Sequence, residues 1–144
     1  MRCSEIMKKD VECASPEDTV ESAAQTMREQ NVGFVPICNE AHEVLGTLTD
    51  RDIAIRLVAD DKPSDTTVQE IMTADCVACR PEDDIGVAAQ TMAEYQKSRI
   101  MCLDDDGRLV GIISLSDIAK QGDDSASATL RQVAHREAKA QMTT

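Results

Sequence analysis

Two short segments of the sequence carry a hydroxyl side chain followed, three residues later, by an aspartate. In GTLTDRDIA these residues are Thr49 and Asp52, and in GIISLSDIA they are Ser114 and Asp117. Each segment predicts a short strand that runs directly into a helix, with the hydroxyl and the carboxylate in the turn between them. An aspartate at such a turn can cap its helix through a side-chain oxygen. The same groups are also suited to hold a polar ligand by hydrogen bonds, and both roles stay open.

Catalytic chemistry is not expected at these turns. The chain has two histidines, His42 and His135, and neither has a Ser, Cys or carboxylate partner arranged for nucleophilic or acid–base chemistry. His42 stands where the matching turn has Gly107, and histidine tolerates the positive φ that such turns often require. We therefore predict that His42 is a turn residue rather than a ligand, and that the chain is not an enzyme.

The two turns belong to an internal repeat with a period of 65 residues. Residues 5–54 align with residues 70–119 without a gap, and the segment AAQTM at 23–27 recurs unchanged at 88–92. A fixed period of this kind indicates a duplicated structural unit. Two copies are too few for a solenoid, so we expect the copies to pack as a pseudo-two-fold pair.

Each copy predicts a strand, a helix, two strands and a closing helix, which makes the fold class α+β with two β-α-β-β-α repeats. Apolar residues recur at i, i+3, i+4 and i+7 within 19–30, as expected for one face of a helix. The first copy predicts strands at 11–14, 34–38 and 44–48 and a closing helix at 50–59. The second copy predicts strands at 76–79, 99–103 and 109–113 and a closing helix at 116–121. The expected domains are 1–61, 62–122 and a C-terminal tail, 123–144, that is partly helical or disordered.

Composition limits the classes of function. The chain has 144 residues, few aromatic residues and a formal net charge of −12. Such a charge disfavours nonspecific binding to nucleic acid or to an anionic membrane, because both are polyanions. The sequence shows no signal peptide and no apolar run near the roughly 20 residues that a membrane span needs. We expect a soluble, cytoplasmic protein with no nucleic-acid or membrane partner.

Six cysteines occur in the chain, and the sequence predicts no metal site from them. Cys76 and Cys79 have the spacing of a zinc-ligand pair, but no second such pair completes a four-ligand site. Without an export signal, the cysteine count does not indicate a secreted disulfide framework.

A tandem pair of such units, each closing with G-x-x-[TS]-x-x-D, resembles the CBS-domain pair, also called a Bateman module. The resemblance covers residues 1 to about 122 and includes both the motif and its repetition. Because the pair carries no attached enzyme or transporter, the chain is similar to the small stand-alone bacterial CBS proteins, including the hypoxic-response type. The resemblance implies a regulatory module that senses a ligand and signals to a partner protein whose identity the sequence does not give.

The resemblance also implies an adenosine-containing ligand, such as AMP, ADP, ATP or S-adenosylmethionine, bound in clefts between the repeats. Asp52 and Asp117 would then hold ribose hydroxyls, and Thr49 and Ser114 would contact phosphate. Arg99 stands at the entry to the strand predicted at 99–103, where nucleotide-sensing relatives keep a phosphate-binding arginine. The other expected ligand contacts are Ser116, Val35, Pro36, Ile100 and Met101. No cofactor is expected to be obligatory.

The two implied sites differ in their residues. Phe34 stands at the position that matches Arg99, and Met101 replaces the proline that is usual after the entry to this strand. We therefore expect unequal sites, with the Asp117 site occupied if only one is.

A second hypothesis is that the chain is a redox-responsive or disulfide-stabilised protein that does not bind nucleotide. In the fold that the resemblance implies, the strand ends that carry Cys13 and Cys38 lie side by side, which would permit a disulfide. Cys79 and Cys102 stand almost, but not quite, at the equivalent places.

Assembly is expected to be homodimeric. The paired alanines at 23–24 and 88–89 cannot all face a three-stranded sheet, so we expect some helical surface to meet another chain. The resemblance to CBS pairs, which commonly dimerise through their helices, implies the same isologous dimer.

Overall fold

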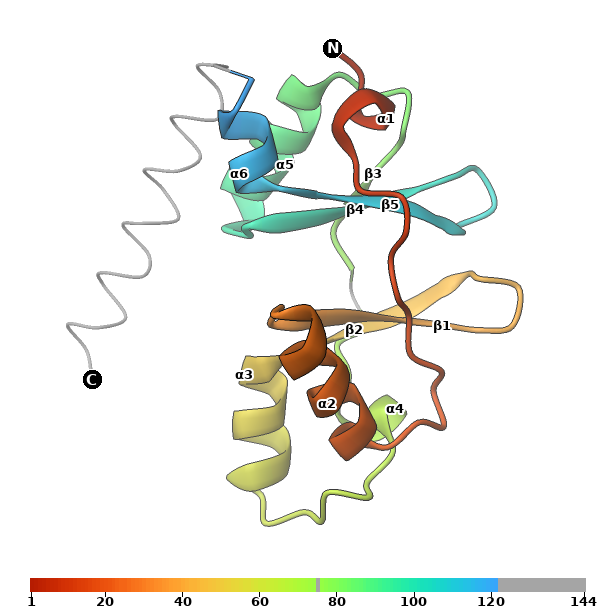
Figure 1. The fold of residues 1–144 in the computed structure, drawn as a ribbon, viewed down its shortest axis with the longest axis vertical. Coiled ribbons are helices and arrows are strands. Elements are labelled where there is room, and N and C mark those ends of the chain that lie inside the picture. Colours follow the sequence, from red (N-terminus) through yellow and green to blue (C-terminus); the bar gives the residue numbers. More distant parts are fainter. Residues whose placement is uncertain (75, 122–144) are drawn as a thin grey trace, which may run out of the picture. The chain divides into compact units, whose positions relative to one another are not determined.

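A computed structural model describes residues 1–74 and 76–121 of the chain, and its elements are labelled in Figure 1. The chain divides into two compact units. Of the described residues, the first unit contains 1–11, 77–106 and 110–121, and the second contains 12–74, 76 and 107–109. The expected tail at 123–144 lies outside the described residues. Helices and strands alternate in both units, which confirms the predicted α+β class.

The second unit is built on a hairpin of two antiparallel strands. Phe34 pairs with Thr49 at one end of this hairpin, and Ala14 forms a parallel bridge with Ile37. The strands are β1 (Phe34–Cys38) and β2 (Val44–Thr49). The helices are α2 (Val20–Gln30), α3 (Asp50–Asp52), the π-helix η1 (Ile53–Val58) and α4 (Val68–Ile71).

Helix α2 forms where the apolar period predicts it. The Thr19 side chain accepts a hydrogen bond from the Ser22 N–H group, which caps the first turn. The helix ends at Asn31, whose φ of 55° lies in the left-handed region that Asn tolerates. Its buried residues, Val20, Ala23 and Met27, join the core of this unit.

The first unit contains a three-stranded sheet. Ala78 and Cys79 pair in parallel with Met101 and Cys102 of the neighbouring strand. The strands, in the order in which they neighbour one another, are β3 (Ala78–Cys79), β4 (Arg99–Leu103) and β5 (Leu109–Ser114). The helices are α1 (Cys3–Ile6), α5 (Ile85–Tyr95) and α6 (Leu115–Ala119).

The apolar face of α5 is already covered within its own unit. Ala88, Ala89 and Met92 are each 0% exposed and belong to the same hydrophobic cluster as Ile100 and Cys102. The expectation that these alanines leave surface for a second chain is therefore wrong for α5. The reason is that α1 and α6 also belong to this unit and contribute Cys3 and Ile118 to the core.

The opening segment of each repeat pairs with a strand of the other repeat. Lys8 forms an antiparallel bridge with Ile112 in the first unit, and Thr73 forms the matching bridge with Thr47 in the second. A Cβ at Gly111 would lie within 3 Å of Met7. The packing units thus divide the chain differently from the boundary expected at 61/62 in the sequence.

The structure differs from the sequence predictions mainly at short elements. The strand predicted at 11–14 is a single bridge at Ala14, and that predicted at 76–79 is reduced to Ala78–Cys79. The helix predicted at 50–59 begins as one α-turn and continues as η1. Within the described ranges, no helix combines the length and apolarity needed to cross a membrane.

Candidate functional site

The turn that carries Ser114 and Asp117 is closed by two reciprocal hydrogen bonds. The Asp117 N–H donates to Ser114 Oγ at 3.2 Å, and the Ser114 N–H donates to Asp117 Oδ2 at 3.0 Å. This capping box begins α6 directly after β5. Asp117 is half-buried, and its second oxygen, Oδ1, has no hydrogen-bond partner within residues 1–74 and 76–121. One carboxylate oxygen therefore positions the turn, and the other is available to a ligand.

The matching turn in the second unit has the same capping box but a different environment. Asp52 Oδ2 accepts from the Thr49 N–H at 3.0 Å, as in the other repeat. Asp52 Oδ1, however, lies 3.4 Å from the Thr73 hydroxyl and 3.9 Å from Arg56 Nε. Both oxygens of this carboxylate are therefore already engaged within the chain.

Arg56 is itself held in place. Its Nη1 donates to the carbonyl oxygens of Ile71 and Met72 at 3.2 and 3.3 Å. Arg56 thereby joins Asp52 to the C-terminal end of α4, in addition to the bridge between Thr47 and Thr73. The Asp52 turn is thus part of the packing of its unit, which sequence spacing did not reveal.

The residue before Arg99 forms a hydrogen bond with the turn that carries Asp117. The N–H of Leu115, the first residue of α6, donates to the carbonyl oxygen of Ser98 at 2.8 Å. Arg99 follows as the first residue of β4 and is exposed. The backbone thus brings a cationic residue and the carboxylate of Asp117 to the same end of β4 and β5.

Two serine hydroxyl groups and a lysine belong to the same end of the sheet as Arg99. Ser114 Oγ and Ser116 Oγ are 2.9 Å apart. Lys8, an exposed residue, pairs through its backbone with Ile112, two residues before Ser114. Lys8 was not among the residues expected from the sequence, although the 65-residue shift matches it with Thr73. At the Asp117 turn a lysine therefore occupies the place that a threonine occupies at the Asp52 turn.

The four apolar residues expected at the ligand have different positions. Val35 and Ile100 belong to the hydrophobic cores of their units, and both are at most 2% exposed. Pro36 and Met101 are the next residues along β1 and β4, so they point to the opposite faces of the strands. They are also buried. Of these four, Pro36 and Met101 are the ones that do not take part in the two clusters.

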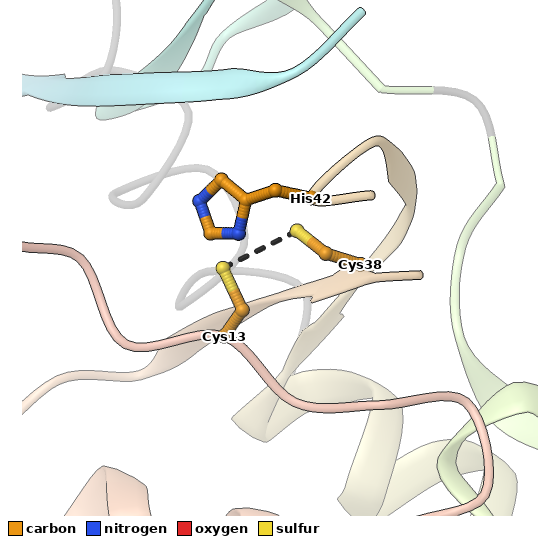
Figure 2. Close-up of side chains that lie close together, drawn as sticks. All are labelled: Cys13, Cys38 and His42. Atoms are coloured by element: carbon orange, nitrogen blue, oxygen red, sulfur yellow. Dashed lines mark hydrogen bonds between the residues drawn. The ribbon is translucent and has the colours of Figure 1, made fainter. Parts of the chain in front are cut away.

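A separate group of side chains gathers in the second unit. Cys13 Sγ and Cys38 Sγ are 3.2 Å apart, and His42 lies beside them (Figure 2). The Cys38 thiol donates a hydrogen bond to Cys13 Sγ, which lowers the pKa of Cys13 and raises that of Cys38. The φ of 66° at His42 confirms its predicted position in a turn. The accompanying expectation that His42 is not a ligand is not supported, because a ring nitrogen lies within 4.8 Å of both sulfurs.

Cys13 is expected to be alkylated by iodoacetamide at lower pH than an ordinary thiol, because the thiolate is the reactive form. Its folded-state pKa lies below the usual 9.0, so a larger fraction of it is ionised near neutral pH. Peptide mapping of the reduced protein across a pH series gives the midpoint for each cysteine. The same series in urea is the reference, and a Cys13 midpoint no lower in the folded protein would contradict this expectation.

Three further cysteines meet in the core of the first unit. Cys79 Sγ lies 3.4 Å from Cys102 Sγ and 3.8 Å from Cys3 Sγ. All three are buried, and the apolar side chains of their cluster surround them. They are free thiols that fill the core.

Comparison with known proteins identifies the family to which this fold belongs. The family model described as "CBS domain" matches residues 3–59 and 68–123. Hypoxic response protein 1 of Mycobacterium tuberculosis is 35% identical over 117 residues, which are 81% of each chain.

Two solved structures have the same fold. The crystal structure of Hypoxic Response Protein I with two coordinated zinc ions has a TM-score of 0.76 and 33% identity, and the match covers 83% of this chain and 98% of that one. The CBS domain pair of protein MJ0100, in complex with 5′-methylthioadenosine and S-adenosyl-L-methionine, has a TM-score of 0.75 and 27% identity, covering 84% and 94%. The predicted resemblance is confirmed: the chain belongs to the CBS domain family and contains two copies of that domain.

Proposed function

We propose that the chain is a regulatory module that binds an adenosine-containing nucleotide at the turn formed by Ser114 and Asp117. The observation that carries this proposal is that Asp117 is half-buried and that its second carboxylate oxygen has no hydrogen-bond partner in the described part of the chain. The MJ0100 pair, which binds two adenosine compounds, supports the choice of ligand class. A carboxylate oxygen in this position can accept hydrogen bonds from ribose hydroxyls.

Phosphate contacts come from the groups around Asp117. Ser114 and Ser116 supply hydroxyls, and Arg99 and Lys8 supply positive charge at the same edge of the unit. Two cations favour an anionic ligand over a cationic one. We therefore expect AMP, ADP or ATP to bind more tightly than S-adenosylmethionine, whose sulfonium adds positive charge. Met101 is the apolar residue that we assign to the base.

The Asp52 turn is a weaker candidate for the same ligand. A ribose there has to displace the Thr73 hydroxyl and Arg56 from Asp52 Oδ1. Its strand begins with Phe34 instead of an arginine. Thr49 and Pro36 remain as proposed contacts for a second molecule at higher ligand concentration.

Isothermal titration of the full chain with AMP, ATP and S-adenosylmethionine tests this function. We expect one molecule to bind tightly per chain, with the nucleotides preferred, and a second molecule to bind only at higher concentration. If none of the three ligands produces binding heat at millimolar concentration, this function is excluded.

Homodimerisation is also part of the proposal. The dimer is supported by the outer face of α5, where two large hydrophobic side chains are exposed. Val87 is 46% exposed and Tyr95 is 56% exposed. Light scattering measures the assembly state directly. A monomer at micromolar concentration, with and without nucleotide, would rule out the dimer.

A second candidate function is redox sensing by Cys13 and Cys38, favoured by their sulfur separation of 3.2 Å. An external disulfide of the glutathione type would be reduced to two thiols while the two cysteines lose two hydrogens and form one S–S bond. Mass spectrometry of the unreduced protein detects this loss of two hydrogens. An unchanged mass after incubation with oxidised glutathione would remove this candidate.

A further inference from the structure

Three side chains of the second unit converge at one point outside the nucleotide site. Cys13, Cys38 and His42 each offer one ligand atom, and these atoms all lie within 4.8 Å of one another (Figure 2). In a tetrahedral zinc site, with Zn–S near 2.3 Å and Zn–N near 2.0 Å, ligand atoms lie roughly 3.3–3.8 Å apart. The 3.2 Å between the two sulfurs is close to this separation. Small side-chain rotations are therefore sufficient to place all three atoms around one ion.

The backbone positions the two cysteines before any ligand arrives. The Ala14 N–H donates to the Pro36 carbonyl oxygen, and the Cys38 N–H donates to the Ala14 carbonyl oxygen, each at 2.9 Å. This parallel bridge sets Cys13 beside Cys38, which is the last residue of β1.

The hairpin turn positions His42. Its N–H donates to the Asn39 carbonyl oxygen at 3.0 Å, while Asn39 Oδ1 accepts from the N–H groups of Ala41 and Glu43. The left-handed backbone at His42 then turns the imidazole back toward the two sulfurs, as Figure 2 shows. Three ligands from two separate segments are thus held by backbone hydrogen bonds, which is the preorganisation that a metal site needs.

We propose that Cys13, Cys38 and His42 form a binding site for one thiophilic divalent metal ion, Zn²⁺ in particular. Two thiolates and an imidazole select Zn²⁺ over Mg²⁺ and Ca²⁺, which prefer oxygen ligands. Cys38 is buried, Cys13 is half-buried and His42 is exposed, so the site lies at the surface and its fourth position is open to water. Binding replaces two S–H bonds by two Zn–S bonds and releases two protons, with no change of oxidation state.

The proposed site also has a consequence for redox chemistry. The metal and a Cys13–Cys38 disulfide use the same two sulfur atoms, so each excludes the other. The site is independent of Asp117, and its failure would leave the nucleotide proposal untouched.

Equilibrium dialysis of the reduced full chain against Zn²⁺, followed by metal analysis, tests the proposal. We expect one Zn²⁺ per chain, and with Co²⁺ as the probe we expect thiolate-to-metal absorption in the near ultraviolet together with tetrahedral d–d bands. Cys13→Ser, Cys38→Ser and His42→Asn should each weaken binding by at least about tenfold, since even loss of an outer-shell partner costs 10- to 100-fold. Asparagine suits position 42 because it tolerates positive φ.

Two control variants separate this site from other ligands in the chain. Cys79→Ala removes a thiol from the core of the other unit, and His135→Asn removes the other histidine of the sequence. Both should retain one bound metal ion, with circular dichroism verifying that each variant is folded. The proposal is overturned if the wild-type chain binds no Zn²⁺, if the three site variants bind it as tightly as the controls, or if bound Co²⁺ shows no thiolate absorption.

Discussion

Replacing Asp117 by alanine is expected to weaken AMP or ATP binding by about 10- to 100-fold. The substitution removes the unpartnered oxygen that we assign to the ribose. A hydrogen bond to a charged group contributes about 1.5–3 kcal/mol, and about 1.4 kcal/mol corresponds to tenfold in affinity. Titration calorimetry of the variant against the wild-type chain measures this change.

The Asp52→Ala variant is the matched control for this experiment. Both aspartates accept a hydrogen bond from the N-cap residue of their helix, so both variants lose the same capping contact. We expect Asp52→Ala to be the less stable protein, because Arg56 and Thr73 lose their partner as well. It should nevertheless retain nucleotide affinity within about threefold of wild type, or roughly 0.6 kcal/mol. The reverse order of affinities would place the ligand at the Asp52 turn and refute the assignment.

Replacing Gly46 by alanine is expected to destabilise the second unit by about 1–3 kcal/mol, the usual cost of overpacking. A Cβ at Gly46 would lie 2.7 Å from the Thr73 carbonyl oxygen and 2.9 Å from Met72 Sδ. Thr73 cannot move away without loss, because its N–H and C=O groups both pair with Thr47 at 2.9 Å. Urea unfolding followed by circular dichroism measures the free energy of unfolding.

The same substitution at Gly86 provides the comparison. Gly86 lies in α5, where a Cβ would meet only Asp84 Oδ2, at 3.0 Å, the end of an exposed side chain. Alanine is the better helix former, so this variant should be neutral or more stable by up to about 1 kcal/mol. Equal stability of the two variants would argue against the close packing of 72–73 on β2.

Much of the fold could be predicted from the sequence because the repeat and the apolar period are strong signals. Helix α2 and the strands β1, β2, β4 and β5 lie within one residue of their predicted limits. Helices α1 and α4 were missed because four residues make a single turn, which is too short to show a period. The exchange of opening segments was missed because it depends on long-range packing, which local patterns do not encode.

The sequence was sufficient to identify the residues of the candidate site, but not the contacts that surround them. Spacing alone identified Asp52 and Asp117 as equivalent residues, and the 65-residue shift identified Phe34 in place of Arg99. Thr73, which contacts Asp52, is 21 residues away in the chain. Arg56 is only four residues from Asp52, but its Nη1 is held by the carbonyl oxygens of Ile71 and Met72. Cys13 and Cys38 were expected to be neighbours, but His42 was considered separately from them, because only the fold brings the turn back over the two sulfurs.

The most direct test of the nucleotide proposal is a crystal structure of the full chain grown with saturating AMP or ATP. We predict that a ribose hydroxyl lies within about 2.7–3.2 Å of Asp117 Oδ1, with the phosphate toward Arg99 and Lys8. Electron density for the nucleotide at the Asp52 turn alone, or no nucleotide at either turn, would contradict the proposal.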